Sequence, residues 1–247
     1  MLRTTFKTSP PSRNGFTLVE LAIVMIIIGL LIGGILKGQE LVESARVTAT
    51  VSQVKGIEAA IATFQDKYNA LPGDIINPGL RIPGCAGVAL CDVSGNGNGI
   101  LNAAIVAPPA GEGLQFFVHL ALADLITGVN PASPAGVGMW GTAVPASPIS
   151  GGWWIGSTSG VAADFTCLAG PVIPRAGTYL LSALLEATGQ GSLTASQAYR
   201  LDAKLDDGVP GSGDVRAAQC DPACGTAAAY AESNQAGGRC NLYIRIH

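Results

Sequence analysis

Glu20 is the residue of this sequence whose position most demands a chemical explanation. It is the only charged residue in residues 16–36, a stretch of 21 residues that is otherwise almost entirely apolar. As a helix, this stretch reaches about 31 Å, the thickness of the hydrocarbon core of a bilayer. A carboxylate in such a span costs roughly 2.5–3.5 kcal/mol at the centre and less near an end. We therefore expect a group in its surroundings to compensate the charge.

The charged residues before the span are all basic: Arg3, Lys7 and Arg13. Basic residues on one side of a span keep that side in the cytoplasm. This asymmetry predicts a cytoplasmic leader, with everything after the span on the other side of the membrane.

The stretch Gly15-Phe16-Thr17-Leu18-Val19-Glu20 and the apolar run behind it resemble the class III signal of type IV pilins and pseudopilins. The resemblance is close over residues 13–70 and loose beyond them. It implies that a prepilin peptidase cuts between Gly15 and Phe16 and that Phe16 becomes an N-methylated terminus. It also implies that Thr17 and Glu20 act in filament assembly, where the carboxylate neutralises the terminal amine of a neighbouring subunit. Two unit charges about 4 Å apart attract by roughly 4 kcal/mol at an effective dielectric constant near 20, which helps to offset their removal from water.

Other interpretations fit the same residues. An ordinary membrane anchor can contain a glutamate, and a secretory signal peptide can be cleaved near the faint match Val42-Glu43-Ser44. Glu40 and Glu43 argue against the signal peptide. The functions to separate are a type IV pilus subunit, a type II secretion pseudopilin, and a membrane-anchored binding protein that never polymerises.

All cysteines follow the span: Cys85, Cys91, Cys167, Cys220, Cys224 and Cys240. An even number outside the cytoplasm predicts disulfides, and the first two are close enough for a local one. The resemblance implies a terminal loop closed by a disulfide between Cys240 and either Cys220 or Cys224. Cys167 then pairs with whichever of these two cysteines remains. A metal cluster is the alternative, but only His119 and His247 could support it, and His119 is expected to be packed.

Two acidic segments are candidates for calcium. In the first, Asp92, Ser94, Asn96 and Asn98 offer oxygens at alternate positions, as in a calcium loop, but Ala103 stands where the bidentate acid belongs. Asx turns explain the same residues. The second segment holds Asp206, Asp207 and Asp214, which resemble the calcium loop of the major pseudopilin, and a solvated turn is the alternative.

The apolar pattern continues past the span as one helical stripe. Its members recur every 3 or 4 residues: Val47, Val51, Val54, Ile57, Ile61, Phe64 and Tyr68. No proline occurs in residues 16–70, and Pro72 ends the pattern. We therefore expect one helix of about 55 residues, about 80 Å long. With the resemblance, this predicts an α+β, pilin-like fold in which a long N-terminal helix packs on an antiparallel sheet.

The chain is expected to have four parts. They are a cleaved leader (1–15), a transmembrane or filament-core half of the helix (16–36), an amphipathic half (37–71) and an extracytoplasmic α+β domain (72–247). In that domain, local patterns predict loops over 73–111, helices over 112–127 and 194–205, and strands over 177–181, 213–217 and 240–246. Trp153 and Trp154 should point to opposite faces of a further strand, with a loop covering the outward ring.

The charge argues against nucleic acid as a partner. The chain carries a net charge of −3, and without its leader 11 basic residues face 17 acidic ones. No basic stripe is present. No zinc-protease motif, phosphate-binding loop or nucleophile elbow occurs, so we expect no enzyme and no cofactor other than the calcium alternative. The resemblance implies other copies of the chain in a helical filament, the prepilin peptidase and the pilus assembly machinery as partners. It places the chain first in the bacterial inner membrane and then in an extracellular or periplasmic filament.

Overall fold

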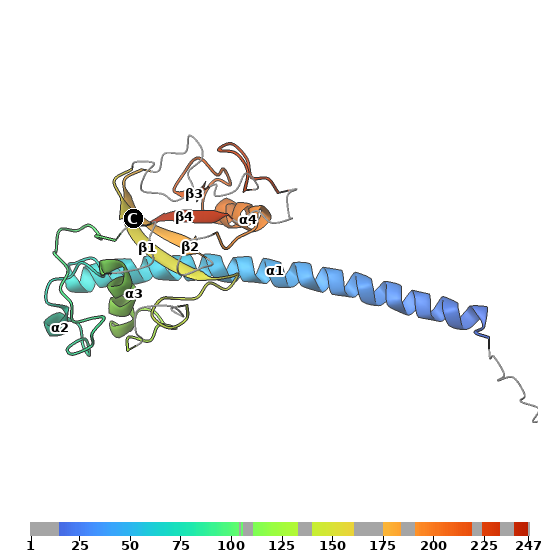
Figure 1. The fold of residues 1–247 in the computed structure, drawn as a ribbon, viewed down its shortest axis with the longest axis horizontal. Helices are drawn as coiled ribbons and strands as arrows, with labels where there is room; N and C mark the ends of the chain where they lie inside the picture. Colours follow the sequence, from blue (N-terminus) through green and yellow to red (C-terminus); the bar gives the residue numbers. More distant parts are fainter. Residues whose placement is uncertain are drawn as a thin grey trace, which may run out of the picture. The chain divides into compact units, whose positions relative to one another are not determined.

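The computed structural model describes residues 15–103, 105, 111–132, 140–160, 175–183, 191–218, 224–232 and 240–246. Contacts divide the chain into two compact units, residues 1–44 and 45–247. The second unit contains the sheet, the shorter helices and the later part of the long helix (Figure 1).

Helix α1 (Leu18–Tyr68) is continuous over 51 residues. Residues 18–42 are exposed on all sides, and from residue 47 onward one stripe of the helix is buried: Val47, Thr50, Val54, Ile57, Ala60, Ile61, Phe64 and Tyr68. Thr50 lies deeper in this stripe than Val51, because its hydroxyl donates to the Arg46 carbonyl at 2.9 Å and so needs no water. The single long N-terminal helix predicted from the sequence is confirmed.

Among the residues that the structure describes, four antiparallel strands form one sheet in the order β1-β2-β4-β3. They are β1 (Gly152–Thr158), β2 (Gly177–Ala183), β3 (Val215–Ala218) and β4 (Asn241–Ile246). One face packs with the buried stripe of α1 through the main core, which includes Trp153, Ile155, Leu180, Leu242 and Ile244. This arrangement confirms the predicted α+β, pilin-like fold class.

The opposite face of the sheet is also covered. Trp154, Tyr179, Leu181 and Tyr243 lie in a second apolar cluster with Ile105, and Trp140 packs against it. The rings of Trp140 and Trp154 are 6.5 Å apart. The prediction that a loop covers the outward tryptophan is therefore confirmed.

In the described residues, α1 is accompanied by three shorter helices. They are α2 (Pro78–Arg81), α3 (Glu112–Leu122) and α4 (Ala195–Leu205). The sequence predicted α3 to reach residue 127, which is wrong, because Asp124 adopts a left-handed backbone conformation with φ 59°. Helix α4 begins with the expected capping box, in which Thr194 and Gln197 each bond the other's backbone N–H.

Candidate functional site

Three hydrogen bonds join Thr17 and Glu20 at the start of α1. The carboxylate oxygen Oε2 of Glu20 accepts from the Thr17 backbone N–H at 2.8 Å and from the Thr17 hydroxyl at 2.9 Å. The Thr17 hydroxyl oxygen in turn accepts from the Glu20 backbone N–H at 3.2 Å. Because Thr17 immediately precedes the first helical residue, this is a reciprocal capping box, which pairs backbone N–H groups that the start of a helix leaves without partners.

Gly15 and Phe16 lie outside the helix. The backbone of residues 15–17 is not helical, and the N–H of Leu21 donates to the Thr17 carbonyl at 3.2 Å. Phe16 is 81% exposed, and no atom lies within 4 Å of the point where a Gly15 side chain would begin. The peptide bond between Gly15 and Phe16 is therefore open to contact with another protein.

An open, mostly apolar groove of about 510 Å³ lies beside the carboxylate. It is lined by Phe16, Glu20, Leu21, Ile23 and Val24. Among the described residues, no basic side chain pairs with Glu20, and its second oxygen, Oε1, accepts no hydrogen bond. Thr17 therefore supplies neutral donors to the carboxylate but leaves its negative charge in place.

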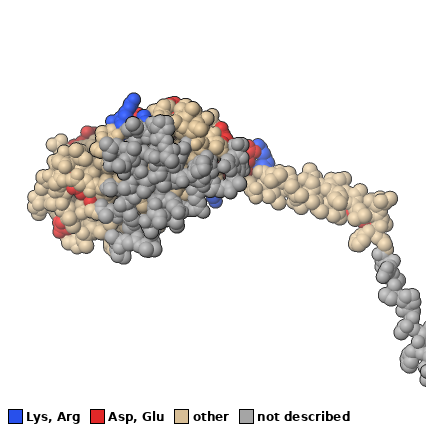
Figure 2. Space-filling view, turned by 45° about the horizontal axis from the view of Figure 1, so that its top comes forward, with Lys and Arg blue, Asp and Glu red and all other residues tan. Residues whose placement is uncertain are grey.

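The helix behind this site has the length and composition of a membrane span. Within the described part of the chain, α1 is the one helix long and apolar enough to cross a membrane. The face of its first half seen in Figure 2 is almost free of charged side chains. A charge at Glu20 is thus set in a long uncharged surface.

The structure shows a contact of Glu20 that was not predicted from the sequence. From the sequence, its carboxylate is expected to act on a neighbouring subunit, and in the structure it caps its own helix. The signal for this cap, Thr-x-x-Glu before an apolar run, stands in the sequence at residues 17–20.

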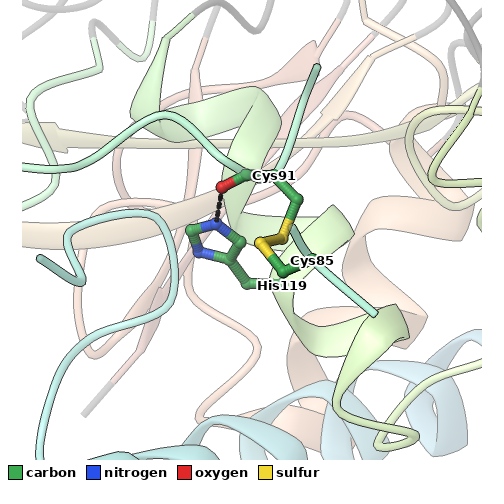
Figure 3. A group of neighbouring side chains, drawn as sticks. All are labelled: Cys85, Cys91 and His119. Atoms are coloured by element: carbon green, nitrogen blue, oxygen red, sulfur yellow. Dashed lines mark hydrogen bonds between the residues drawn. A yellow bond between two sulfur atoms is a disulfide. The ribbon is translucent and has the colours of Figure 1, made fainter. Parts of the chain in front are cut away.

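His119 lies beside a disulfide but serves the fold. Cys85 is bonded to Cys91, and the His119 ring is next to them (Figure 3). Nδ1 of His119 accepts from the Gly73 N–H at 2.9 Å, and Nε2 lies 3.1 Å from the Cys91 carbonyl, to which it donates. Burial lowers the pKa of His119 to about 4, although the bond to Cys91 opposes this shift. Both ring nitrogens and both sulfur atoms are therefore already bonded, and the three residues form a structural brace.

The first calcium candidate is a set of turns. The Asp92 carboxylate accepts from the Gly87 N–H at 3.1 Å. The side-chain oxygen of Asn96 accepts from the Asn98 N–H, and that of Asn98 accepts from the Ile100 N–H. Each of these oxygens accepts a separate backbone N–H, and the bonds of Asn96 and Asn98 are those of Asx turns.

Asp74, which the sequence did not single out, organises the same loop. Its carboxylate is buried and accepts from the N–H groups of Gly97 and Gly99, both at 2.7 Å. Its place after Pro72-Gly73 is the available sequence signal, because Asp is favoured in turns.

The second calcium candidate was expected to consist of Asp206, Asp207 and Asp214, and the structure groups different residues. The carboxylates of Asp202, Asp206 and Asp207 lie within 4.8 Å of one another. The Asp214 carboxylate is not in this set and lies 3.6 Å from the Arg245 guanidinium, although the Asp214 N–H donates to the Asp206 carboxylate at 2.6 Å. Asp202 belongs to the set because α4 ends beside Asp206 and Asp207.

Asp202 is the buried member of this cluster. Its carboxylate accepts from the Tyr230 hydroxyl at 2.8 Å and from the Gly208 N–H at 3.3 Å. Burial raises the pKa of Asp202 to about 6, and the charges of Asp207 and Asp206 add to this shift. The three carboxylates thus form a local excess of negative charge.

The last cysteine closes a loop with Cys224. Cys224 and Cys240 form a disulfide with a Cα–Cα distance of 5.4 Å. The sequence left Cys220 and Cys224 open as partners of Cys240, and the structure pairs Cys240 with Cys224. Cys167 and Cys220 lie outside the described residues.

Comparison with known proteins identifies the motif at the N-terminal site. Residues 10–36 match the prokaryotic N-terminal methylation motif. The chain thus carries a class III prepilin signal typical of type IV pilins and pseudopilins, which implies processing by a prepilin peptidase. With the apolar half of α1, the motif indicates anchoring in the inner membrane before assembly. No curated protein and no solved structure matches the chain.

Proposed function

We propose that this chain is a structural subunit of a type IV pilus or a pilus-like filament, processed between Gly15 and Phe16 and assembled through α1. The observation that carries this proposal is the state of Glu20. It is a carboxylate without a basic partner among the described residues, at the start of a helix whose exposed surface up to residue 36 is otherwise uncharged and mostly apolar. In lipid, or in a bundle of apolar helices, such a charge needs a cation nearby.

The terminal amine of a second copy supplies that cation. Hydrolysis of the Gly15–Phe16 bond turns the Phe16 nitrogen into an amine at the end of an apolar helix, and N-methylation leaves it basic. Oε1 of Glu20 is available for this amine while Oε2 stays in the capping box. An attraction of roughly 4 kcal/mol at about 4 Å helps to offset the desolvation of both charges. Close packing of the apolar helices supplies the remaining gain.

The proposal is tested first by the mature amino terminus. The chain is expressed with a prepilin peptidase and its methyltransferase, purified, and analysed by mass spectrometry. We expect a chain that begins with N-methylated Phe16. A chain that keeps its leader would identify a membrane-anchored protein that does not polymerise.

Substitution of Glu20 tests the second step. We expect Glu20→Gln, which removes the charge but keeps a side-chain acceptor for the Thr17 N–H, to be processed normally but to form no filaments, as seen by electron microscopy of sheared cells. Glu40→Gln is the matched control, because Glu40 lies on the same helix in an exposed pair with Lys37. Filaments in normal amounts from the Glu20→Gln chain would show that assembly does not need this carboxylate.

A type II secretion pseudopilin is the second candidate, favoured by the cluster of Asp202, Asp206 and Asp207. If the cluster binds calcium, the ion should raise the melting temperature of the chain, and Asp206→Asn with Asp207→Asn should abolish the increase. Asp92→Asn is the control at the other acidic segment. An unchanged melting temperature in millimolar calcium would leave the pilus subunit as the better assignment.

A further inference from the structure

We propose that the capping box of Thr17 and Glu20 also positions the peptide bond that is cut, by determining where α1 begins. This inference rests on the proposed function, because it concerns the same cleavage. Phe16 is the last residue before the cap, and residues 15–17 are not helical. The bond between Gly15 and Phe16 therefore lies just outside the first helical turn, in exposed backbone.

The chemistry of cleavage explains why this position matters. Water adds across the bond between the Gly15 carbonyl carbon and the Phe16 nitrogen, which leaves a carboxylate on the leader and an amine on Phe16. A peptidase must reach both atoms. If the helix began earlier, the Gly15 carbonyl would accept the N–H of Val19, and the first turn would cover the bond. A capped start at Leu18 keeps that carbonyl unpaired and accessible.

The environment makes the cap decisive. In an apolar medium each backbone N–H without a partner costs several kcal/mol, so a helix without a cap gains by extending toward water. The Thr17 hydroxyl oxygen is the acceptor that pairs the Glu20 N–H. If Thr17 lacks this hydroxyl, the nearest preceding residue whose type caps helices well is Asn14. A cap at Asn14 would make Gly15, Phe16 and Thr17 the first helical residues and would enclose the scissile bond.

The experiment measures cleavage of the full-length precursor in lipid vesicles by a prepilin peptidase. Thr17→Val, which keeps the shape but removes the hydroxyl, is expected to be cleaved about five-fold more slowly, the factor that corresponds to the loss of a typical N-cap. Thr17→Ser keeps the hydroxyl and should restore the rate. Thr63→Val is the matched control, because the Thr63 hydroxyl donates to the Ala59 carbonyl far from the start of the same helix.

Two further measurements separate the cap from direct recognition and from charge. Backbone chemical shifts in micelles should show residues 15–17 becoming helical in Thr17→Val. Glu20→Gln keeps a side-chain acceptor for the Thr17 N–H, so we expect it to be cleaved at a near wild-type rate although its charge is gone.

Several results would overturn the inference. They are a wild-type rate for Thr17→Val, an equally slow Thr17→Ser, or slow cleavage of Thr17→Val while residues 15–17 stay extended. A wild-type precursor that is never cut after Gly15 would instead overturn the proposed function.

Discussion

The indole N–H of Trp153 on β1 donates a 2.8 Å hydrogen bond to the side-chain oxygen of Gln53 on α1. The Gln53 amide donates in turn to the Ala146 carbonyl at 2.9 Å. Apolar contacts tolerate small shifts along a helix axis, whereas hydrogen bonds weaken steeply with distance and angle. This one amide therefore fixes the register between the long helix and the sheet.

Gln53→Leu should destabilise the domain. The substitution leaves the buried Trp153 N–H without a partner, which costs about 1–3 kcal/mol. Denaturant unfolding of the detergent-solubilised chain, followed by tryptophan fluorescence, measures the loss. Gln65→Leu is the control, because Gln65 is exposed on the same helix, and its effect should stay within about 0.5 kcal/mol. Equal midpoints for the two variants would show that the register does not depend on Gln53.

The sequence predicts the backbone of this fold well, because its elements are long and strongly periodic. The buried stripe of α1 and the alternating last strand follow directly from periods of 3.6 and 2 residues. The end of α3 does not follow, because the apolar pattern continues through Leu125 while Asp124 turns left-handed. The burial of Thr50 beside the partly buried Val51 does not follow either, because its hydroxyl is satisfied by a hydrogen bond that no hydropathy pattern shows.

In the candidate site, too, some features could be predicted from the sequence and others could not. The positions of Gly15, Phe16 and Glu20 in one motif are visible in the sequence, because they are local. The nearness of Asp202 to Asp206 is also local, because the two are four residues apart at the end of a predicted helix. The burial of Asp202 against Tyr230 is not visible in the sequence, because these residues are 28 positions apart. Local chemistry could thus be predicted, and contacts made by tertiary packing could not.

His119 should make the domain less stable in acid. Its pKa is about 4 in the folded chain against an ordinary 6.5, so between these values the unfolded chain binds more protons. Stability is complete above pH 6.5 and falls as the pH drops toward 4, by up to about 3 kcal/mol. His119→Gln can still accept from Gly73 and donate to Cys91 but does not titrate. Denaturant midpoints from pH 4 to 7 should therefore fall less in this variant, and an unchanged slope would show that His119 is not the group responsible.

Asp202 should change the stability of the domain with pH in the opposite direction to His119. Its pKa is about 6 in the folded chain against an ordinary 3.8, so protonation of Asp202 favours the folded state. This contribution is complete below pH 3.8 and is lost as the pH rises through 6, by up to about 3 kcal/mol. Asp202→Asn keeps an oxygen for the Tyr230 hydroxyl without the charge, so its stability relative to wild type should be greater at pH 7.5 than at pH 4. Asp66→Asn, at an exposed position on α1, should show no such difference.

The two described disulfides should contribute unequally to stability. Cys85 and Cys91 are separated by 6 residues, and Cys224 and Cys240 by 16. Because a longer closed loop removes more entropy from the unfolded chain, the first cross-link is worth about 2 kcal/mol and the second about 3 kcal/mol. Replacing each pair by serine and measuring thermal unfolding tests the order.

The smaller loop carries a second consequence, because the Cys91 carbonyl accepts from His119. Loss of the Cys85–Cys91 bond loosens the backbone that holds this acceptor, so the His119 ring gains access to water and its pKa should rise toward 6.5. The stability of the serine variant should then depend less on pH between 4 and 6.5, whereas loss of Cys224–Cys240 should leave that slope intact. If stability depended on pH equally in both serine variants, His119 would be held in place by packing with Phe64 rather than by the disulfide. The centroids of these two stacked rings are 6.4 Å apart.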